Sequence, residues 1–380
     1  IPLDSAGALI GRKEQQESLL SGLERTQPIL LYGQAGTGKS SLILRLPKQA
    51  KNKILPPIQI DLAALNLPHS TISQQVLKML GQHLFQMSRV RAPDEHAPNY
   101  LHRFHDFLVK ACEIDPVRKI VVIIERLELV LKANVDDLSL LIIFLSNVSL
   151  HIPNFRLIFV GRVLPKEVEE IARNNSPIGM NLIKLSFLDD KGSQALLNTP
   201  LDSVIARFRD DAVDHLYDLT NGQPVLLQTM AYHVVARFNE RQKDEKDFPD
   251  PVFSAAMIDD FFGIHLQGSE AFFDPSQAKL LPFWKKAEPF FSYFLEPADR
   301  RSIHHRQLLN EIAKEPDGVA EEIILRHDPK NPGIGQQLGL SVERVQAILG
   351  ELETLDLLRR DTNSKNWKVA IELLRIYLLM

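Results

Sequence analysis

The sequence contains a single cysteine, Cys112, so the chain cannot form an internal disulfide bond. Unpaired cysteines are usual in reducing compartments, and we expect a cytoplasmic protein in which Cys112 is a buried filler. An excess of positive charge is also lacking, because 44 Lys and Arg residues face 48 Asp and Glu residues, for a formal net charge of −4. This balance argues against a broad surface that binds nucleic acid.

Long apolar runs are missing as well. The longest, Leu138–Leu150, is interrupted by serines and an asparagine and is too short to span a bilayer. It predicts a buried helix, and we expect no association with a membrane. The length of 380 residues, with 44% hydrophobic and 24% charged residues, is typical of a soluble globular chain of two or three domains.

The most informative stretch is Pro28–Leu42, in which an apolar run leads into Gly33-x4-Gly38-Lys39-Ser40 and a helical pattern follows. This is the phosphate-binding loop in its strand–loop–helix setting. Lys39 brings a positive charge to the β- and γ-phosphates, and the Ser40 hydroxyl is suited to Mg²⁺. The sequence therefore predicts that the chain binds a nucleotide triphosphate with Mg²⁺. The loop residues that we expect at the nucleotide are Gly33, Gln34, Ala35, Gly36, Thr37, Gly38, Lys39, Ser40 and Ser41.

A second predicted strand, Lys119–Glu125, is apolar throughout until it ends in an acid. Its continuous hydrophobicity indicates that both faces are covered, as in a parallel α/β sheet. Phosphoryl transfer to water needs one carboxylate for Mg²⁺ and another group that polarises the water. Here Glu125 is followed by Arg126, which stays protonated and cannot act as the base. Glu125 is either the metal ligand, or it is the base while Ile124 stands at the metal position; in both cases one carboxylate is missing and we expect slow hydrolysis.

Two further side chains are candidates for this chemistry. Glu128 either substitutes for the missing carboxylate or pairs with Arg126. Arg162 follows the predicted strand Phe155–Val160, and it either reaches a phosphate or is a solvated charge at the strand end. The candidate catalytic residues are therefore Glu125, Glu128 and Arg162, with Ser40 and Glu125 as the candidate metal ligands.

The segment Ala8–Glu14 precedes an amphipathic helix and contains a Gly-Arg-x-Glu element ahead of the phosphate-binding loop. This element resembles the adenine-side segment of AAA+ and STAND ATPases. The resemblance implies that Ile10, Gly11 and Arg12 lie over the base of the nucleotide. From the residues alone, a capping turn before a surface helix is the alternative.

Further along the chain, Asn181–Asp190 and Leu219–Gln228 resemble the lid of STAND-type ATPases, whose hallmark is a Gly-x-Pro element. Gly222 ends one predicted helix and Pro224 begins the next with a preset φ. The resemblance implies that Pro224 lies against the bound nucleotide. A plain turn between two helices is the alternative.

The segment Gly333–Leu349 has a helix–turn–helix pattern, and the strands and helix that follow it resemble the winged helix of STAND-type ATPases. The would-be recognition helix, Val342–Asp356, has four acidic residues against Arg344 alone. Contact with phosphates needs cations, so this face is wrong for the major groove. Arg359 and Arg360 on the wing allow only weak contact with a DNA backbone, and we expect a module that contacts protein or is autoinhibitory.

The resemblance covers nearly the whole chain and implies an α/β fold: a parallel-sheet P-loop NTPase core of the AAA+/STAND type (residues 1–188), a helical lid (189–250), and a helical region with a winged-helix domain (251–380). The charged segment Glu240–Asp250 marks the second boundary. The family implies a switch, closed with ADP and open or assembled with ATP, that works with a separate protein partner, here unidentified. Assembly into a homo-oligomer on ATP binding is left open. The alternatives are a DNA-engaging AAA+ ATPase (an initiator, loader or transposition regulator) and a scaffold that binds nucleotide without turnover.

Overall fold

A computed structural model describes residues 10–50, 52–65, 71–129, 135–162, 168, 179–198, 207–242, 252–262, 265–267, 270–272, 282–361 and 363–379. The chain divides into two compact units. Unit 1 comprises Ile1–Gly33 and Gly38–Leu185, and unit 2 comprises Gln34–Thr37 and Ser186–Met380. The predicted boundary at residue 250 lies outside the described residues, so the three-domain division stays a prediction.

Unit 1 is built on a parallel sheet of five strands in the order β2-β3-β4-β1-β5. The strands are β1 (Ile29–Tyr32), β2 (Ile58–Asp61), β3 (Ile120–Glu125), β4 (Phe155–Gly161) and β5 (Asn181–Lys184). Each pair of neighbours is parallel. The apolar runs 119–125 and 155–160 predicted β3 and β4 to within one residue, because these two strands are buried along nearly their whole length.

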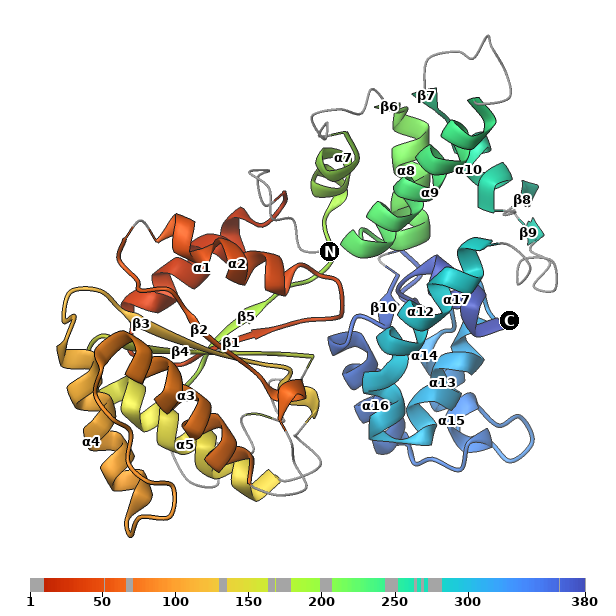
Figure 1. Cartoon of the computed structure of the whole chain (residues 1–380). Helices are drawn as coiled ribbons and strands as arrows, with labels where there is room; N and C mark the ends of the chain where they lie inside the picture. The colour runs from red at the N-terminus through yellow and green to blue at the C-terminus, as the bar shows by residue number, and fades with distance from the viewer. Residues whose placement is uncertain are drawn as a thin grey trace. The chain divides into compact units, whose positions relative to one another are not determined.

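Helices cover both faces of this sheet (Figure 1). On one face lie α1 (Lys13–Glu24) and α2 (Lys39–Gln49), and on the other α3 (Ile72–Ser88), α4 (Tyr100–Glu113) and α5 (Val135–His151). A separate apolar cluster fills each interface. The cluster beneath α2 includes Leu42, Val121 and Ile123, whereas the cluster beneath α3 to α5 includes Ile60, Phe104 and Ile124. Leu138–Leu150 is part of α5, and its helical state is confirmed.

Unit 2 is mainly helical. Its elements are α7 (Asp190–Asn198), β6 (Arg207–Phe208), α8 (Asp210–Thr220), α9 (Pro224–Gln242), β7 (Val252–Phe253), α10 (Ala255–Phe262), β8 (His265–Gln267), β9 (Glu270–Phe272), α12 (Pro282–Arg301), α13 (Ile303–Ala313), α14 (Glu321–Leu325), α15 (Ile334–Gln337), α16 (Val342–Thr354), β10 (Leu358–Arg360), β11 (Trp367–Val369) and α17 (Glu372–Leu379). None of the helices among the described residues is both long and apolar enough to cross a membrane.

Two turns in unit 2 lie where the sequence places them. α8 ends at Thr220, and Gly222 has a φ of 73° before α9 begins at Pro224. A Cβ at Gly222 would overlap the Leu188 carbonyl oxygen, so only glycine fits there. Near the C-terminus, the Ser341 hydroxyl caps α16 by accepting a hydrogen bond from the Arg344 backbone N–H at 3.3 Å. β10 and β11 pair antiparallel, as expected of a hairpin.

Candidate nucleotide-binding site

The loop after β1 has the backbone that its glycines predict. Gly33, Gly36 and Gly38 all have positive φ, and α2 begins at Lys39. At Gly33, where φ is 147°, a Cβ would overlap the Leu185 carbonyl oxygen beyond the end of β5. The first glycine of the motif is thus needed both for its conformation and for the close approach of two strand ends.

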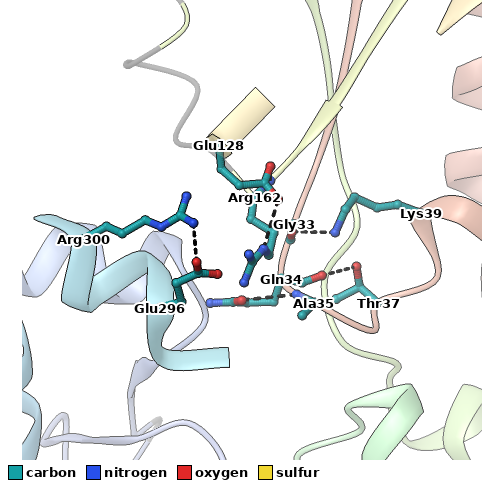
Figure 2. A network of polar contacts seen from close by, with 9 residues as sticks. All are labelled: Gly33, Gln34, Ala35, Thr37, Lys39, Glu128, Arg162, Glu296 and Arg300. Atoms are coloured by element: carbon teal, nitrogen blue, oxygen red, sulfur yellow. Dashed lines mark hydrogen bonds and ion pairs between the residues drawn. The ribbon is translucent and has the colours of Figure 1, made fainter. Parts of the chain in front are cut away.

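Lys39 lies across this loop, and its Nζ donates a hydrogen bond of 2.7 Å to the Gly33 carbonyl oxygen (Figure 2). Ser40 is exposed and Ser41 half-buried on the first turn of α2. A Cβ on Gly38 would meet nothing within 4 Å, so there is open space beside the start of the helix. An ammonium group, a free hydroxyl and a helix N-terminus therefore surround a space that suits a phosphate chain.

The tip of the loop, Gln34–Thr37, is buried and belongs by its contacts to unit 2. Within the tip, the Ala35 backbone N–H donates to Gln34 Oε1 at 3.2 Å, and Thr37 Oγ1 donates to the Gln34 carbonyl oxygen at 2.9 Å (Figure 2). These bonds use the Gln34 side chain and the Thr37 hydroxyl to hold the loop's own backbone. Sequence reasoning had placed both residues at the nucleotide, and that role stays a prediction.

Pro224 begins α9 in the same unit, and the residue before it contacts the loop tip. Gln223 is fully buried; its Nε2 donates to the Ala35 carbonyl oxygen at 2.7 Å, and its Oε1 accepts from the Leu226 backbone N–H at 2.7 Å. Within unit 2, the Gly-x-Pro segment and the loop tip are therefore in contact. Sequence reasoning missed Gln223, because the variable middle position of that motif carries no signal of its own.

Glu125 ends β3 at the carboxyl edge of the sheet and lies in register with Asp61, which ends β2. Successive side chains of a strand point to opposite faces. Ile60 and Ile124 belong to the cluster beneath α3 to α5, whereas Ile123 belongs to the cluster beneath α2. Asp61 and Glu125 therefore point to the face of α2, the helix that begins at the phosphate-binding loop. The same alternation turns Ile124 away from the loop, which favours Glu125 as the metal ligand over Glu125 as the base.

The electrostatics agree with this placement. Burial raises the pKa of the Glu125 carboxyl, and the negative charge of Asp61 raises it further, while the positive charges of Arg126 and Lys39 oppose both effects. Two carboxylates and two cations thus lie within electrostatic range of one another at this edge. Sequence reasoning missed Asp61, which lies far from Glu125 along the chain. Because the carboxyl ends of parallel strands meet at one edge, the signal was available to find it.

Arg126 follows Glu125 with a φ of 66°, a left-handed conformation that is uncommon for a residue with a long side chain. Its Nη2 lies 3.3 Å from the Asp61 Oδ2. The other oxygen of that carboxylate, Oδ1, accepts a hydrogen bond from the Ala63 backbone N–H at 2.9 Å. The cation next to the strand-end acid is therefore paired with the neighbouring strand.

Glu128 pairs with Arg162, as Figure 2 shows. One Glu128 carboxylate oxygen accepts from the Arg162 backbone N–H at 2.9 Å and the other from its Nε at 3.2 Å. The two side chains are only 10% and 3% exposed. A buried pair of this kind holds the ends of β3 and β4 together, and the catalytic roles predicted for both residues remain untested.

The N-terminal candidates lie just ahead of α1. Gly11 has a φ of 66°, and Arg12 is 5% exposed, with its carbonyl oxygen accepting from the Gln16 backbone N–H at 3.0 Å. Ile10 is half-buried. The turn is thus part of the packed structure of unit 1, and the contact of these residues with an adenine stays a prediction.

The residues present fit a nucleotide with Mg²⁺. In the part of the chain that the structure describes, no group of three or more His, Cys, Asp or Glu side chains is placed to hold a metal by itself. Mg²⁺ usually keeps several waters and takes one or two carboxylates together with substrate phosphates. Ser40 and the carboxylates at the sheet edge are ligands of that kind, so a metal bound here would arrive with its nucleotide.

Comparison with known proteins agrees with this fold. Residues 8–160 match the family model of the AAA ATPase domain. No curated protein is similar enough in sequence to match the chain. Among solved structures, the Walker-type ATPase PABY2304 of Pyrococcus abyssi is similar over 98% of this chain and 96% of that chain, with 15% identity and a TM-score of 0.63.

Two further solved structures are similar at lower scores. ORC1 of Aeropyrum pernix, solved in complex with DNA, has 15% identity over 97% of this chain and 92% of that chain, with a TM-score of 0.43. Cdc6p of Pyrobaculum aerophilum has 12% identity over 100% and 96%, with a TM-score of 0.44. At such scores these two structures carry no argument; the predicted α/β P-loop NTPase fold is confirmed by the parallel sheet and by the likeness to the Pyrococcus abyssi ATPase.

Proposed function

We propose that this chain binds ATP together with Mg²⁺, hydrolyses it slowly, and uses the bound nucleotide as a switch. The observation that carries the proposal is the end of β3, where Glu125 faces the phosphate-binding loop and the next residue is an arginine paired with Asp61. The site has the groups that hold a triphosphate, Lys39 and Ser40 among them. It lacks at the second position the carboxylate that would activate water.

In this proposal each group has one task. Lys39 supplies a fixed positive charge to the β- and γ-phosphates, the loop N–H groups bind their oxygens, and Ser40 and Glu125 hold Mg²⁺, which neutralises phosphate charge when bound. Arg126 adds a cation without accepting a proton. The site is therefore better suited to hold ATP than to cleave it.

The switch acts on unit 2, whose contacts include the loop tip. Gln223, the residue before Pro224, is hydrogen-bonded to the Ala35 carbonyl oxygen. A nucleotide that reshapes the loop backbone changes the acceptor of this bond, and α9 begins at the next residue. We propose that this coupling controls the binding of a separate protein partner in the cytoplasm, with self-assembly in the ATP state as one form of it.

A DNA-engaging ATPase is the alternative, and the candidate wing of unit 2 does not favour it. Arg359 Nη1 donates to Asn221 Oδ1 at 2.7 Å, and the Arg360 guanidinium pairs with Glu321 and lies 4.6 Å from the centre of the Trp367 ring. Both arginines are therefore engaged within the chain. We propose that the hairpin β10–β11 and helix α16 form a winged helix that contacts protein.

The test is ATP affinity by calorimetry with Mg²⁺ present, comparing the unmodified chain with Lys39→Ala. A hydrogen bond to a charged group contributes about 1.5–3 kcal/mol, so we expect a loss of roughly 10- to 100-fold or more. Lys53→Ala is the matched control, because Lys53 is 71% exposed and pairs with Glu24. An unchanged affinity in Lys39→Ala would refute the assignment of the loop.

The same preparation tests turnover. Free of any partner, the chain should release phosphate at or below about one turnover per minute, far under the 1–10³ s⁻¹ typical of enzymes. A fast rate from the unmodified protein would show that the missing carboxylate is replaced by another group.

A further inference from the structure

The end of the sheet that carries Glu125 carries a second carboxylate, that of Asp61. Asp61 ends β2 in register with Glu125, and both point to the face of α2. Lys39 at the start of that helix lies within electrostatic range of Glu125, as does Asp61. Asp61 and Glu125 are far apart in the sequence, but the pairing of two parallel strands places them side by side.

The partner of Asp61 is a cation that can be displaced. The Arg126 and Asp61 side chains are 52% and 42% exposed, and the distance between Arg126 Nη2 and Asp61 Oδ2 is 3.3 Å. An ion pair that is this exposed to solvent contributes little net stabilisation. A doubly charged ion that arrives with a triphosphate competes well for such a carboxylate.

We propose that Asp61 is the second carboxylate of the nucleotide site: with Glu125 it holds the hydrated Mg²⁺ of bound ATP, and Arg126 is its counter-ion when no nucleotide is present. The proposal rests on the ATP binding proposed above. Mg²⁺ characteristically keeps part of its water shell and binds one or two carboxylates beside the phosphates, which is the set that Asp61 completes.

The arrangement of Arg126 follows from the same assignment. Its left-handed backbone turns the chain sharply after Glu125, and its guanidinium lies at Asp61. When Asp61 turns to the metal, Arg126 is released beside the triphosphate, where a cation adds to affinity. In the proposal, Asp61 and Arg126 pair with each other when no nucleotide is bound. With ATP bound, Asp61 would contact the hydrated Mg²⁺ and Arg126 would contact a phosphate.

A purely structural role for Asp61 is separable by experiment. Asp61 Oδ1 accepts the Ala63 N–H and so caps the short turn Leu62–Ala64. Asp61→Asn keeps an oxygen for this bond and removes the charge. Asp115→Asn is the matched control, since Asp115 likewise accepts a backbone N–H, from Arg118 at 3.0 Å, and pairs with the Arg118 side chain, but it precedes β3 at the opposite edge of the sheet.

The experiment is an equilibrium titration of the full chain with a fluorescent ATP analogue, in EDTA and then at increasing Mg²⁺, so that no turnover is measured. We expect Asp61→Asn to raise, by about tenfold or more, the Mg²⁺ concentration at which half of the gain in affinity for the analogue is reached. Loss of a group that supports a metal site typically has an effect of this size. Its affinity for the metal-free analogue should stay equal or become tighter. Arg126→Gln should do the reverse, with weaker metal-free binding and a lower Mg²⁺ midpoint.

The outcomes separate the possibilities. A Mg²⁺ midpoint in Asp61→Asn equal to those of the unmodified chain and Asp115→Asn would overturn the proposal and leave Asp61 as a turn cap. Equal losses with and without Mg²⁺ would also overturn it, because Asp61 would then act on the loop and not on the metal. If the unmodified chain binds no analogue, the proposed function itself fails. Thermal unfolding of each variant shows whether the fold is kept.

Discussion

Glu125 and Arg126 stand together at the end of β3, yet they meet different surroundings. Glu125 points to the face of the phosphate-binding loop and is partly buried, and burial raises the pKa of its carboxyl. Arg126 leaves the strand in a left-handed conformation and pairs with Asp61. The exchange of an acid for an arginine at this single position therefore removes a proton acceptor and adds a charge that β2 must compensate.

This exchange predicts the effect of restoring the acid. In Glu125→Asp with Arg126→Glu, the second carboxylate returns to the position beside the metal ligand, and a positioned general base typically contributes about 10²–10⁴-fold. We expect phosphate release to rise by at least about tenfold, whereas Glu125→Gln alone should lower whatever rate exists. The readout is single-turnover hydrolysis at saturating ATP, with the affinity measured in parallel. No gain in the double variant would mean that positioning, and not the base, limits the rate.

At the scale of elements, the sheet depends on the contact between the ends of β1 and β5. The Leu185 backbone N–H donates to the Tyr32 carbonyl oxygen at 2.8 Å, and the Leu185 carbonyl lies where a Cβ on Gly33 would be. The loop therefore starts from a fixed point that two strands share.

Gly33→Ala should separate these strand ends. The substitution combines a backbone conformation that alanine rarely adopts with overlap against another backbone, and strain and overpacking of this kind cost about 2–4 kcal/mol together. We expect a lower midpoint of thermal unfolding and loss of ATP binding. Gly179→Ala is the control, since a Cβ there meets nothing within 4 Å. A Gly33→Ala variant as stable as its control would contradict the role of this contact.

Elements with continuous apolar sequence were predictable, and so was the glycine loop, because local pattern alone produces them. β3 was placed to within one residue of its observed ends, and a helix, α2, follows the glycine loop as predicted. The neighbours of Glu125 were not predictable in this way, because they depend on which strands pair. Asp61 lies next to Glu125 because β2 and β3 pair in that register, and Glu128 contacts Arg162 because β3 and β4 are neighbours in the sheet. The left-handed turn at Arg126 is not indicated by any pattern in the sequence.

For the whole molecule, the distribution of charge bears on the choice between protein and DNA as partner. The net charge is −4, and the wing arginines Arg359 and Arg360 are engaged with Asn221, Glu321 and Trp367. Contact with phosphates would have to break these interactions. A surface of this kind fits a protein partner better than a duplex.

We therefore expect no binding of duplex DNA at physiological salt, with or without ATP, in a fluorescence anisotropy titration. Replacing both wing arginines, Arg359→Glu with Arg360→Glu, should leave that result unchanged. Salt-dependent binding of duplex DNA that requires ATP and is lost in the double variant would contradict this prediction. It would favour the DNA-engaging alternative.

The strand order has a consequence for how the protein is made. β1 lies between β4 and β5, so Ile29 pairs with Ile158 and with Asn181, which are synthesised far later. At about 5–20 residues per second, the emerging chain carries an unpaired apolar strand for roughly 10–30 seconds. Non-local pairing of this kind is slow to form and open to aggregation meanwhile. The ribosome must therefore deliver nearly the whole of unit 1 before the loop at Gly33 can acquire the shape that binds a nucleotide.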